Sequence, residues 1–228
     1  MNAITKKSLF LTFIFCFTLL GLQAQDERSL NTFDEISVIG NIEVVLQKGD
    51  QEKAVVYTEN IPEEDVDINV SGGILKLRLL KSLQKDVKVK VELTYTSLRT
   101  IKGSAGAKIS GNSDINSEIL YLRAHSGAHL SLDIRTKELN AASYEGGVIK
   151  LGGKADSQSI TASTGGQVKG LDLDCDRTRV KVNTGGQAKV VANQFLKATA
   201  NTGGQIEYKG QPEDKSTKTL LSGKIKQV

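Results

Sequence analysis

The sequence predicts an all-β protein: a single-stranded parallel β-helix, or β-solenoid, with coils of about 20 residues and an irregular β-rich N-terminal cap. Three observations predict this fold. After residue 25, short runs with apolar residues at every second position recur, and no helical period persists. A glycine-containing motif returns six times at near-constant spacing. The chain has 22 Gly but only 2 Pro, 2 Cys and 0 Trp, which excludes a collagen-like chain and a disulfide-based scaffold.

Residues 1–24 have the pattern of a secretory signal peptide. Lys6 and Lys7 precede an almost wholly apolar run over residues 8–22, and Ala24 supplies the small residue at the cleavage edge. A membrane-spanning helix is the alternative, but the run is shorter than the roughly 20 residues that a span needs. We therefore expect an exported protein, located in the periplasm, on the outer surface or in the medium, whose mature chain is residues 25–228.

Cleavage also changes the charge and the cysteine count. The net charge falls from +4 to +2 because Lys6 and Lys7 leave with the signal. So small an excess, scattered along the chain, does not indicate a nucleic-acid or membrane-binding patch. Cys175 remains as the lone thiol, in phase with Leu171 and Leu173, and we expect it to be buried and inert.

Residues 25–100 contain strand-like runs with less regular spacing. Ser71 and two following glycines predict a hairpin between two of them, and residues 61–65 read as an acidic loop. We expect these strands to form the first, irregular coils and to cap one end of the solenoid. The predicted strands are 33–46, with a break at 40–41, then 54–58, 66–70, 74–80 and 87–93.

Residues 101–210 carry the regular repeat. Thr-Gly-Gly-Gln occurs at 164–167, 184–187 and 202–205, and looser copies occur at 104–107, 126–128 and 144–147. An alignment on one glycine of each copy gives spacings of 21, 20, 19, 20 and 18 residues. Glycine lacks a Cβ and permits positive φ, so we expect each copy to form the corner of a coil. The aligned glycines are Gly106, Gly127, Gly147, Gly166, Gly186 and Gly204.

Stacked coils would bring equivalent residues into ladders about 4.8 Å apart. An antiparallel sandwich with a hairpin at each glycine pair would also show alternation, but it would not require the same residues at the same offset in every repeat. We find no linker that marks a second domain, so we expect one domain over 25–228, with 211–228 as a C-terminal tail or cap. The predicted ladders are Thr164, Thr184 and Thr202; Gln167, Gln187 and Gln205; and Asn183 with Asn201.

The motifs also support a resemblance to a known family. After the signal peptide, the motifs are Phe33-x-x-Ile-x-Val-x-Gly40 and Gly49-Asp50, then the glycine repeats, and finally Gly210-x-Pro212 and Ser222-Gly-x-Ile225. Over residues 30–226 it resembles the secreted proteins described as putative auto-transporter adhesin, head GIN domain, which are common in Bacteroidetes envelopes. The resemblance implies a parallel β-helix and an adhesive role, and it carries no catalytic residue set. Lys224 departs from the family pattern, where a further glycine is common.

Asp172, Asp174 and Asp176 are the strongest candidates for chemistry. Alternate residues of a strand share a face, so the three carboxylates would project together, as in a carbohydrate-active β-helix. The alternative is a solvated strand face, charge-paired with nearby arginines. An EF-hand is excluded because Arg177 and Asn183 stand where its loop needs Gly and Glu.

His125 and His129 are the only histidines and flank a glycine turn. On a helix they would suit a metal, but here we expect two exposed turn residues. No nucleophile elbow or phosphate-binding loop is present, and we predict no metal, no cofactor and no catalytic residue.

The function expected from the sequence is therefore a non-enzymatic binding, adhesion or scaffold protein of the cell envelope, with a protein or glycan partner and no nucleic acid. The alternative is an enzyme that uses the acidic strand. The Thr and Gln ladders are the candidate binding surface, but the motif also suits a purely structural corner in which stacked amides bond to one another.

Overall fold

The computed structural model describes residues 26–80 and 87–228, and all but one of the regular elements in these ranges are β-strands. The exception is a turn of 3-10 helix, η1 (Glu63–Asp65), within the predicted acidic loop. The predicted all-β class is confirmed. The predicted signal peptide lies outside the described residues.

The strands join into a single 18-stranded sheet that curls back on itself. The N-terminal strands are β1 (Asp26–Ser29), β2 (Glu35–Ile39), β3 (Glu43–Lys48), β4 (Lys53–Glu59), β5 (Val66–Ser71), β6 (Ile74–Leu79) and β7 (Lys88–Tyr95). The strands of the regular part are β8 (Thr100–Ser104), β9 (Lys108–Gly111), β10 (Ile115–Ala124), β11 (His129–Tyr144), β12 (Val148–Ser163), β13 (Gln167–Val182), β14 (Gln187–Val191), β15 (Phe195–Ala200), β16 (Gln205–Lys209), β17 (Asp214–Thr219) and β18 (Lys224–Gln227).

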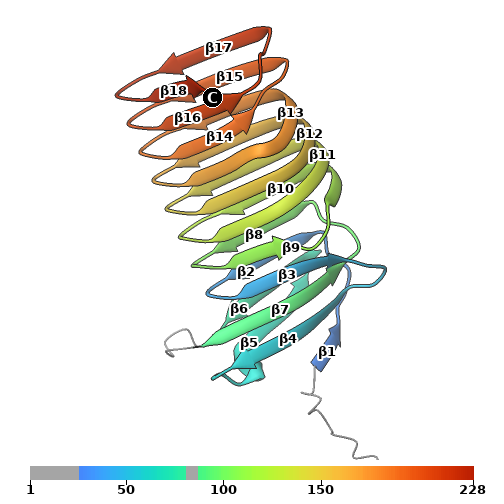
Figure 1. Cartoon of the computed structure of the whole chain (residues 1–228). Helices are drawn as coiled ribbons and strands as arrows, with labels where there is room; N and C mark the ends of the chain where they lie inside the picture. Colours follow the sequence, from blue (N-terminus) through green and yellow to red (C-terminus); the bar gives the residue numbers. More distant parts are fainter. Residues whose placement is uncertain (1–25, 81–86) are drawn as a thin grey trace, which may run out of the picture.

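The regular part is a β-solenoid, as predicted. Each coil pairs with the next through parallel strands, and the coils appear as successive layers in Figure 1. Equivalent residues are 21, 19, 19, 20, 18 and 19 positions apart, so coils of about 19 residues repeat seven times. The residues that define this register are Lys108, His129, Val148, Gln167, Gln187, Gln205 and Lys224.

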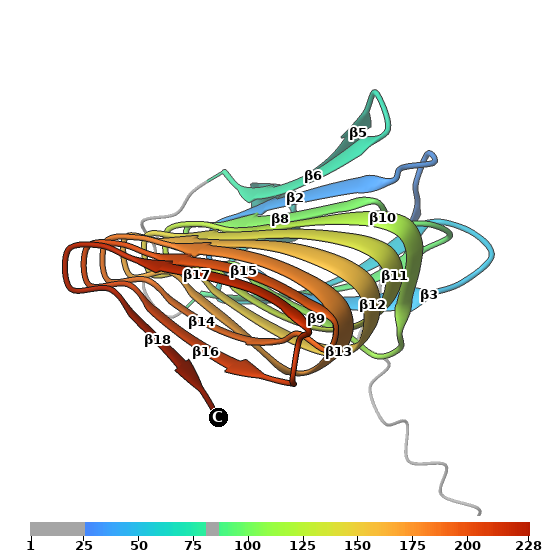
Figure 2. The ribbon, with the colours of Figure 1, turned by 90° about the horizontal axis from the view of Figure 1, so that it is seen from above.

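Two flanks and two corners make up each coil (Figure 2). We define flank A as the strands β6, β2, β8, β10, β15 and β17 with the second halves of β11, β12 and β13. Flank B contains β7, β3, β9, β14, β16 and β18 with the first halves of those three strands. Tight glycine turns join the flanks on one side. On the other side the 16-residue strands β11, β12 and β13 bend around the second corner without a break.

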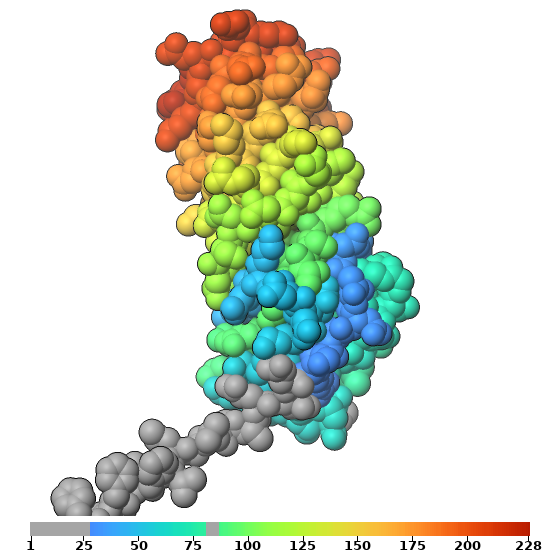
Figure 3. All heavy atoms as spheres, turned by 90° about the vertical axis from the view of Figure 1, so that its right-hand side faces the viewer, coloured from blue at the N-terminus to red at the C-terminus, as the bar shows by residue number. Residues whose placement is uncertain are grey.

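The N-terminal strands form a curled mixed sheet at one end of the column (Figure 3). The predicted hairpin is present: β5 pairs antiparallel with β6, and Gly72 and Gly73 take φ values of 58° and 76° between them. The chain order differs from the spatial order, because β2 and β3 insert between β6–β7 and β8–β9. Antiparallel β4, β5 and β1 then close this end.

The interior is narrow and almost wholly apolar. Inward positions alternate with outward ones along the long strands, and small residues such as Ala141, Ala155 and Ala162 occupy some of the buried positions. A buried polar cluster lies near the second corner. There, the Gln158 amide donates to the Thr178 hydroxyl (2.9 Å), and both side chains donate to the Val191 carbonyl, at 3.0 and 2.6 Å.

Cys175 points into this interior, as predicted. Burial raises the pKa of its thiol to about 11. The native thiol should therefore not react with a disulfide reagent at neutral pH, and it should react fully in concentrated guanidinium chloride. Because the protonated thiol is favoured only in the folded state, the free energy of unfolding should also fall as pH rises from about 8.5 toward that raised pKa. Fast labelling of the native protein would show that Cys175 is accessible.

Each glycine corner requires positive φ at two residues and close packing at the residue that follows them. In the central repeat, Thr184 and Gly185 take φ values of 46° and 67°, and the Gly186 N–H donates to the Asn183 carbonyl at 2.9 Å. Positive φ at both central residues is the type I′ pattern. We expected positive φ at Gly186, but its φ is not positive. A Cβ on Gly186 would lie 2.7 Å from the Ala162 carbonyl oxygen of the preceding coil, so close packing requires this glycine.

The φ values also show that the alignment of the first two repeats with the later ones must be shifted by one residue. Gly106 and Gly127 have positive φ, at 83° and 75°, and are therefore equivalent to Gly185 rather than to Gly186. Their own coils place Ala107 and Ala128 at the close-packed position. The residue types alone could not reveal this, because each early repeat has a single glycine to align.

The last coil lies in the segment predicted as a tail or cap. β17 and β18 pair with β15 and β16, and Leu221 and Ser222 take the positive φ values of the closing corner. All six residues of β17 are exposed, and polar side chains occupy its inward positions. Polar inward residues at the end of a sheet disfavour pairing with another chain.

Candidate functional site

The Thr-Gly-Gly-Gln motifs lie at successive corners, and their residues are in register. Gln167 pairs with Gln187, and Gln187 with Gln205, on the outer face of flank B. Within the described residues, no hydrogen bond joins these three side chains. The coils are joined here by backbone: the N–H of Gly185 donates to the Thr202 carbonyl at 3.0 Å, and equivalent bonds recur along the stack.

The asparagine ladder beside them does carry a side-chain bond. The Asn201 Nδ2 donates to the Asn183 Oδ1 at 2.9 Å, from one coil to the next. In the last coil Leu220 stands at the equivalent position, and the Asn201 Oδ1 is buried without a hydrogen-bond partner. The asparagine ladder thus holds two neighbouring coils together, and it ends before the final coil.

Asp172, Asp174 and Asp176 occupy positions of β13 that are not buried. β13 has one more residue than β12 between Lys169 and Asp172, and the strand then bends around the second corner. Asp174 is already engaged, since it accepts from the Asn193 amide at 2.8 Å and lies 3.7 Å from the Lys154 ammonium. Among the described residues, no group of three His, Cys, Asp or Glu side chains is placed to hold a metal ion.

The histidines flank the second repeat corner, as predicted. The His129 Nδ1 contacts the Gly127 carbonyl at 2.9 Å. His125 lies in a small cluster in which its Nδ1 is 2.7 Å from the Ser126 Oγ and its Nε2 is 3.3 Å from the Glu145 Oε1. This set has the residue types of a hydrolytic triad.

The surroundings of that cluster do not support hydrolysis. The Ser126 hydroxyl also donates to the Glu145 Oε2 at 3.0 Å, and His125 and Glu145 are exposed at the corner. The N–H of Gly127, next to the serine, donates to the Glu145 carbonyl instead of facing a substrate oxyanion. The cluster therefore joins two successive corners.

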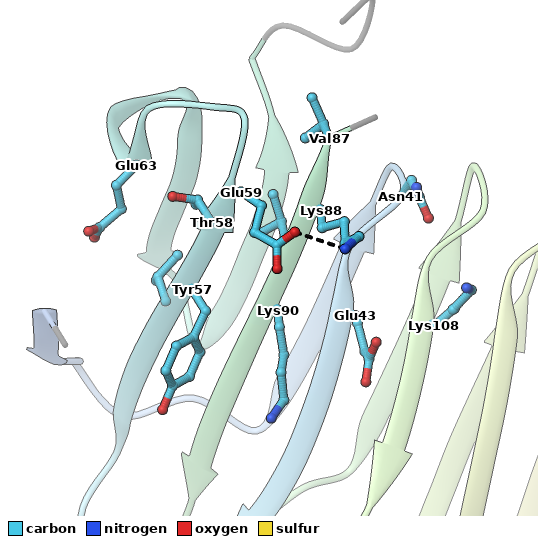
Figure 4. Close-up of a pocket in the computed structure, with 12 residues that line it drawn as sticks. Asn41, Glu43, Tyr57, Thr58, Glu59, Glu63, Val87, Lys88, Lys90 and Lys108 are labelled. Carbon is cyan, nitrogen blue, oxygen red and sulfur yellow. Dashed lines mark hydrogen bonds and ion pairs between the residues drawn. The ribbon is translucent and has the colours of Figure 1, made fainter. Parts of the chain in front are cut away.

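A groove at the N-terminal end, which the sequence did not predict, has a volume of about 590 Å³ (Figure 4). It forms where antiparallel β4 and parallel β3 meet β7. Two of its lysines are bound to carboxylates. Lys88 binds Glu59 at 2.8 Å, and Lys90 binds Glu92 at 2.8 Å while lying over the ring of Tyr57. The bond from Lys90 also lowers the pKa of the Glu92 carboxyl.

Comparison with known proteins identifies the fold family. A family model described as putative auto-transporter adhesin, head GIN domain, matches residues 32–212. The chain belongs to this family. The resemblance drawn from the turn and strand motifs is thereby confirmed. A search of the curated proteins gives no match.

Solved structures of several other proteins share the fold over nearly the whole chain. A putative adhesin from Bacteroides fragilis is 20% identical with a TM-score of 0.78, and the match covers 90% of this chain and 96% of that one. A putative adhesin from Parabacteroides distasonis is 19% identical with a TM-score of 0.73, with coverage of 90% and 96%. A putative lipid binding protein from the same species is 20% identical with a TM-score of 0.67, with coverage of 91% and 98%.

Within the described part of the chain, no helix is long and apolar enough to cross a membrane.

Proposed function

We propose that this head GIN-domain protein is a non-enzymatic binding protein of the cell envelope, exported by its N-terminal signal and attached to a glycan or protein through a flank of the solenoid. One observation carries the proposal. The coils stack in register, so each flank presents a broad, exposed sheet face on which side chains recur at every strand, about 4.8 Å apart. Such a face suits an extended, repetitive partner.

The comparisons with known proteins also support a binding role. Its description and the names of two of the similar structures refer to adhesins, and one similar structure is named a lipid binding protein. Adhesion to envelope material is compatible with all of these names. The contacts made by Asp174 give no support to the enzymatic alternative.

Binding of the mature protein, residues 25–228, to a native envelope fraction tests the proposal. We expect saturable binding with no release of reducing ends from the envelope polysaccharides. Asp174→Ala should bind as the wild-type protein does, because Asp174 has no role in attachment. Release of sugar ends that disappears in Asp174→Ala would establish the enzyme instead.

Gln187→Ala separates the two interpretations of the corner motif. The Gln187 side chain is exposed, and its backbone holds the stack, so we expect nearly unchanged envelope binding and at most a small fall in melting temperature. Loss of attachment at full stability would show that the Thr and Gln ladders are the recognition surface. The paired measurements are a binding isotherm and a thermal melt followed by circular dichroism.

A further inference from the structure

A shallow trough on the outer face of flank A has the shape of a ligand site. It lies over β8, β10, β11 and β12 and has a volume of about 390 Å³. Two neighbouring strands supply its floor through short side chains that are in register with each other. We call these residues the trough floor: Asn140 and Ala142 of β11, and Ser159 and Thr161 of β12.

Longer side chains stand on both sides of this floor. Tyr121 and Arg123 of β10 are in register with the floor residues of β11. Arg179 and Lys181 of β13 are in register with the floor residues of β12. Tyr121 and Arg123 line the trough, whereas Arg179 and Lys181 stand on the next strand beyond its floor, and the backbones of β10 and β13 are about 14 Å apart. The side chains that extend from Arg123 across the floor to Arg179 suit an elongated ligand.

Three cations beside the trough floor have no counter-charge in the part of the chain that the structure describes. Arg123, Arg179 and Lys181 form no ion pair with any residue of the described ranges, and all three are exposed. Glu35 is the one carboxylate that lines the trough, and Lys102 binds it. The larger N-terminal groove differs in this respect, because two of its three lysines, Lys88 and Lys90, are bound to neighbouring carboxylates. The trough therefore offers free positive charge.

The positive face continues beyond the trough. Arg177, Lys197 and Lys218 are exposed on β13, β15 and β17, and Asp214 is the one carboxylate among the outward residues that these strands contribute to flank A. The guanidinium groups of Arg177 and Arg179 both lie over the ring of Phe195, 5.3 and 5.2 Å from its centroid. The ring thus helps to hold Arg179 at the edge of the trough.

We propose that the trough binds a linear acidic glycan, a polysaccharide that carries carboxylates. The inference deepens the proposed binding function and rests on it. The planar guanidinium groups of Arg123 and Arg179 match carboxylates in bidentate geometry. Tyr121 is 45% exposed and offers a ring on which the apolar face of a sugar can pack. The hydroxyl and amide groups of the floor can bond to sugar hydroxyls.

A membrane is a poorer match, because the trough has no exposed aliphatic cluster to insert. A nucleic acid would require aromatic rings free for base stacking, and the Phe195 ring is already in contact with the Arg177 and Arg179 guanidinium groups. Tyr121 alone would supply a single stacking position. Both classes of partner enter the test as competitors.

Affinity electrophoresis with polygalacturonate as the probe tests the inference. We expect the mature protein to be retarded by this probe and not by neutral dextran. Arg123→Gln with Arg179→Gln should weaken binding about tenfold or more. Tyr121→Ala leaves the charge unchanged and should still weaken binding several-fold. The matched control is Lys150→Gln with Lys169→Gln, which removes two exposed charges from flank B and should change little.

Several outcomes would overturn the inference. They are equal losses in the flank B control, wild-type affinity in Tyr121→Ala, and equally good competition by DNA or by phosphatidylglycerol vesicles. All substituted side chains are on the outer surface, so thermal melts should show that the variants fold. The envelope-binding assay runs in parallel. Envelope binding without polygalacturonate binding refutes the acidic glycan alone, whereas loss of both refutes the binding function as well.

Discussion

Gly186→Ala is expected to lower the free energy of unfolding by about 3 kcal/mol, because a methyl group there would overlap backbone of the preceding coil. The new Cβ would lie 2.7 Å from the Ala162 carbonyl oxygen and 3.0 Å from the Ser163 nitrogen. Neither atom can move without disturbing the strand pairing between coils. The substitution therefore tests whether the repeated glycine keeps the stack closely packed.

Gly185→Ala is the matched control in the same turn. Gly185 has a φ of 67°, but apart from its chain neighbours no atom lies within 4 Å of the position that a methyl group would take there. Gly185→Ala should therefore lower the free energy of unfolding only by the amount expected for an alanine at positive φ, about 1 kcal/mol. Urea titrations of the two variants should therefore give clearly different midpoints. Equal destabilisation would mean that backbone conformation, and not close packing, explains both glycines.

The second large effect is expected when Gln158→Leu and Thr178→Val are combined. Each single change leaves the Val191 carbonyl with one of its two side-chain donors. It should therefore lower the free energy of unfolding by about 1 kcal/mol. The double change removes both donors from this buried position. We expect the double change to lower the free energy of unfolding by about 3 kcal/mol, which exceeds the sum of the two single effects.

A double-mutant cycle built from urea titrations measures this coupling. Strict additivity would contradict the shared role of Gln158 and Thr178 at the Val191 carbonyl. Ser157→Ala offers a control in the same strand, because the Ser157 side chain is exposed and makes one long hydrogen bond of 3.3 Å to the Lys137 carbonyl. We expect its effect to be close to zero.

The solenoid was predictable because stacking imposes a rule on the sequence itself. Coils that lie on one another make Thr184 a neighbour of residues about 19 positions away, so the same residue types recur at one offset. Alternation over residues such as 129–134 then gives the inward and outward faces directly. The same logic placed Asn183 beside Asn201 and Cys175 in the interior.

The N-terminal arrangement was beyond such reasoning, because it depends on long-range pairing. Nothing local in β2 indicates that it lies between β6 and β8, since alternation fixes the face of a strand and not its partner. The groove near Tyr57 escaped prediction for the same reason, and so did the part of the trough that β2 contributes through Glu35. Each brings together side chains from strands whose register is known only in three dimensions.

Lysine acetylation of the mature protein, free and bound to a native envelope fraction, tests most directly the claim that attachment uses the outer face of flank A. Lys181 of flank A and Lys169 of flank B are both exposed, so both should react in the free protein. In the bound protein we predict that Lys181 is protected and that Lys169 reacts as before. Protection of Lys169 with full reactivity of Lys181 would contradict the account.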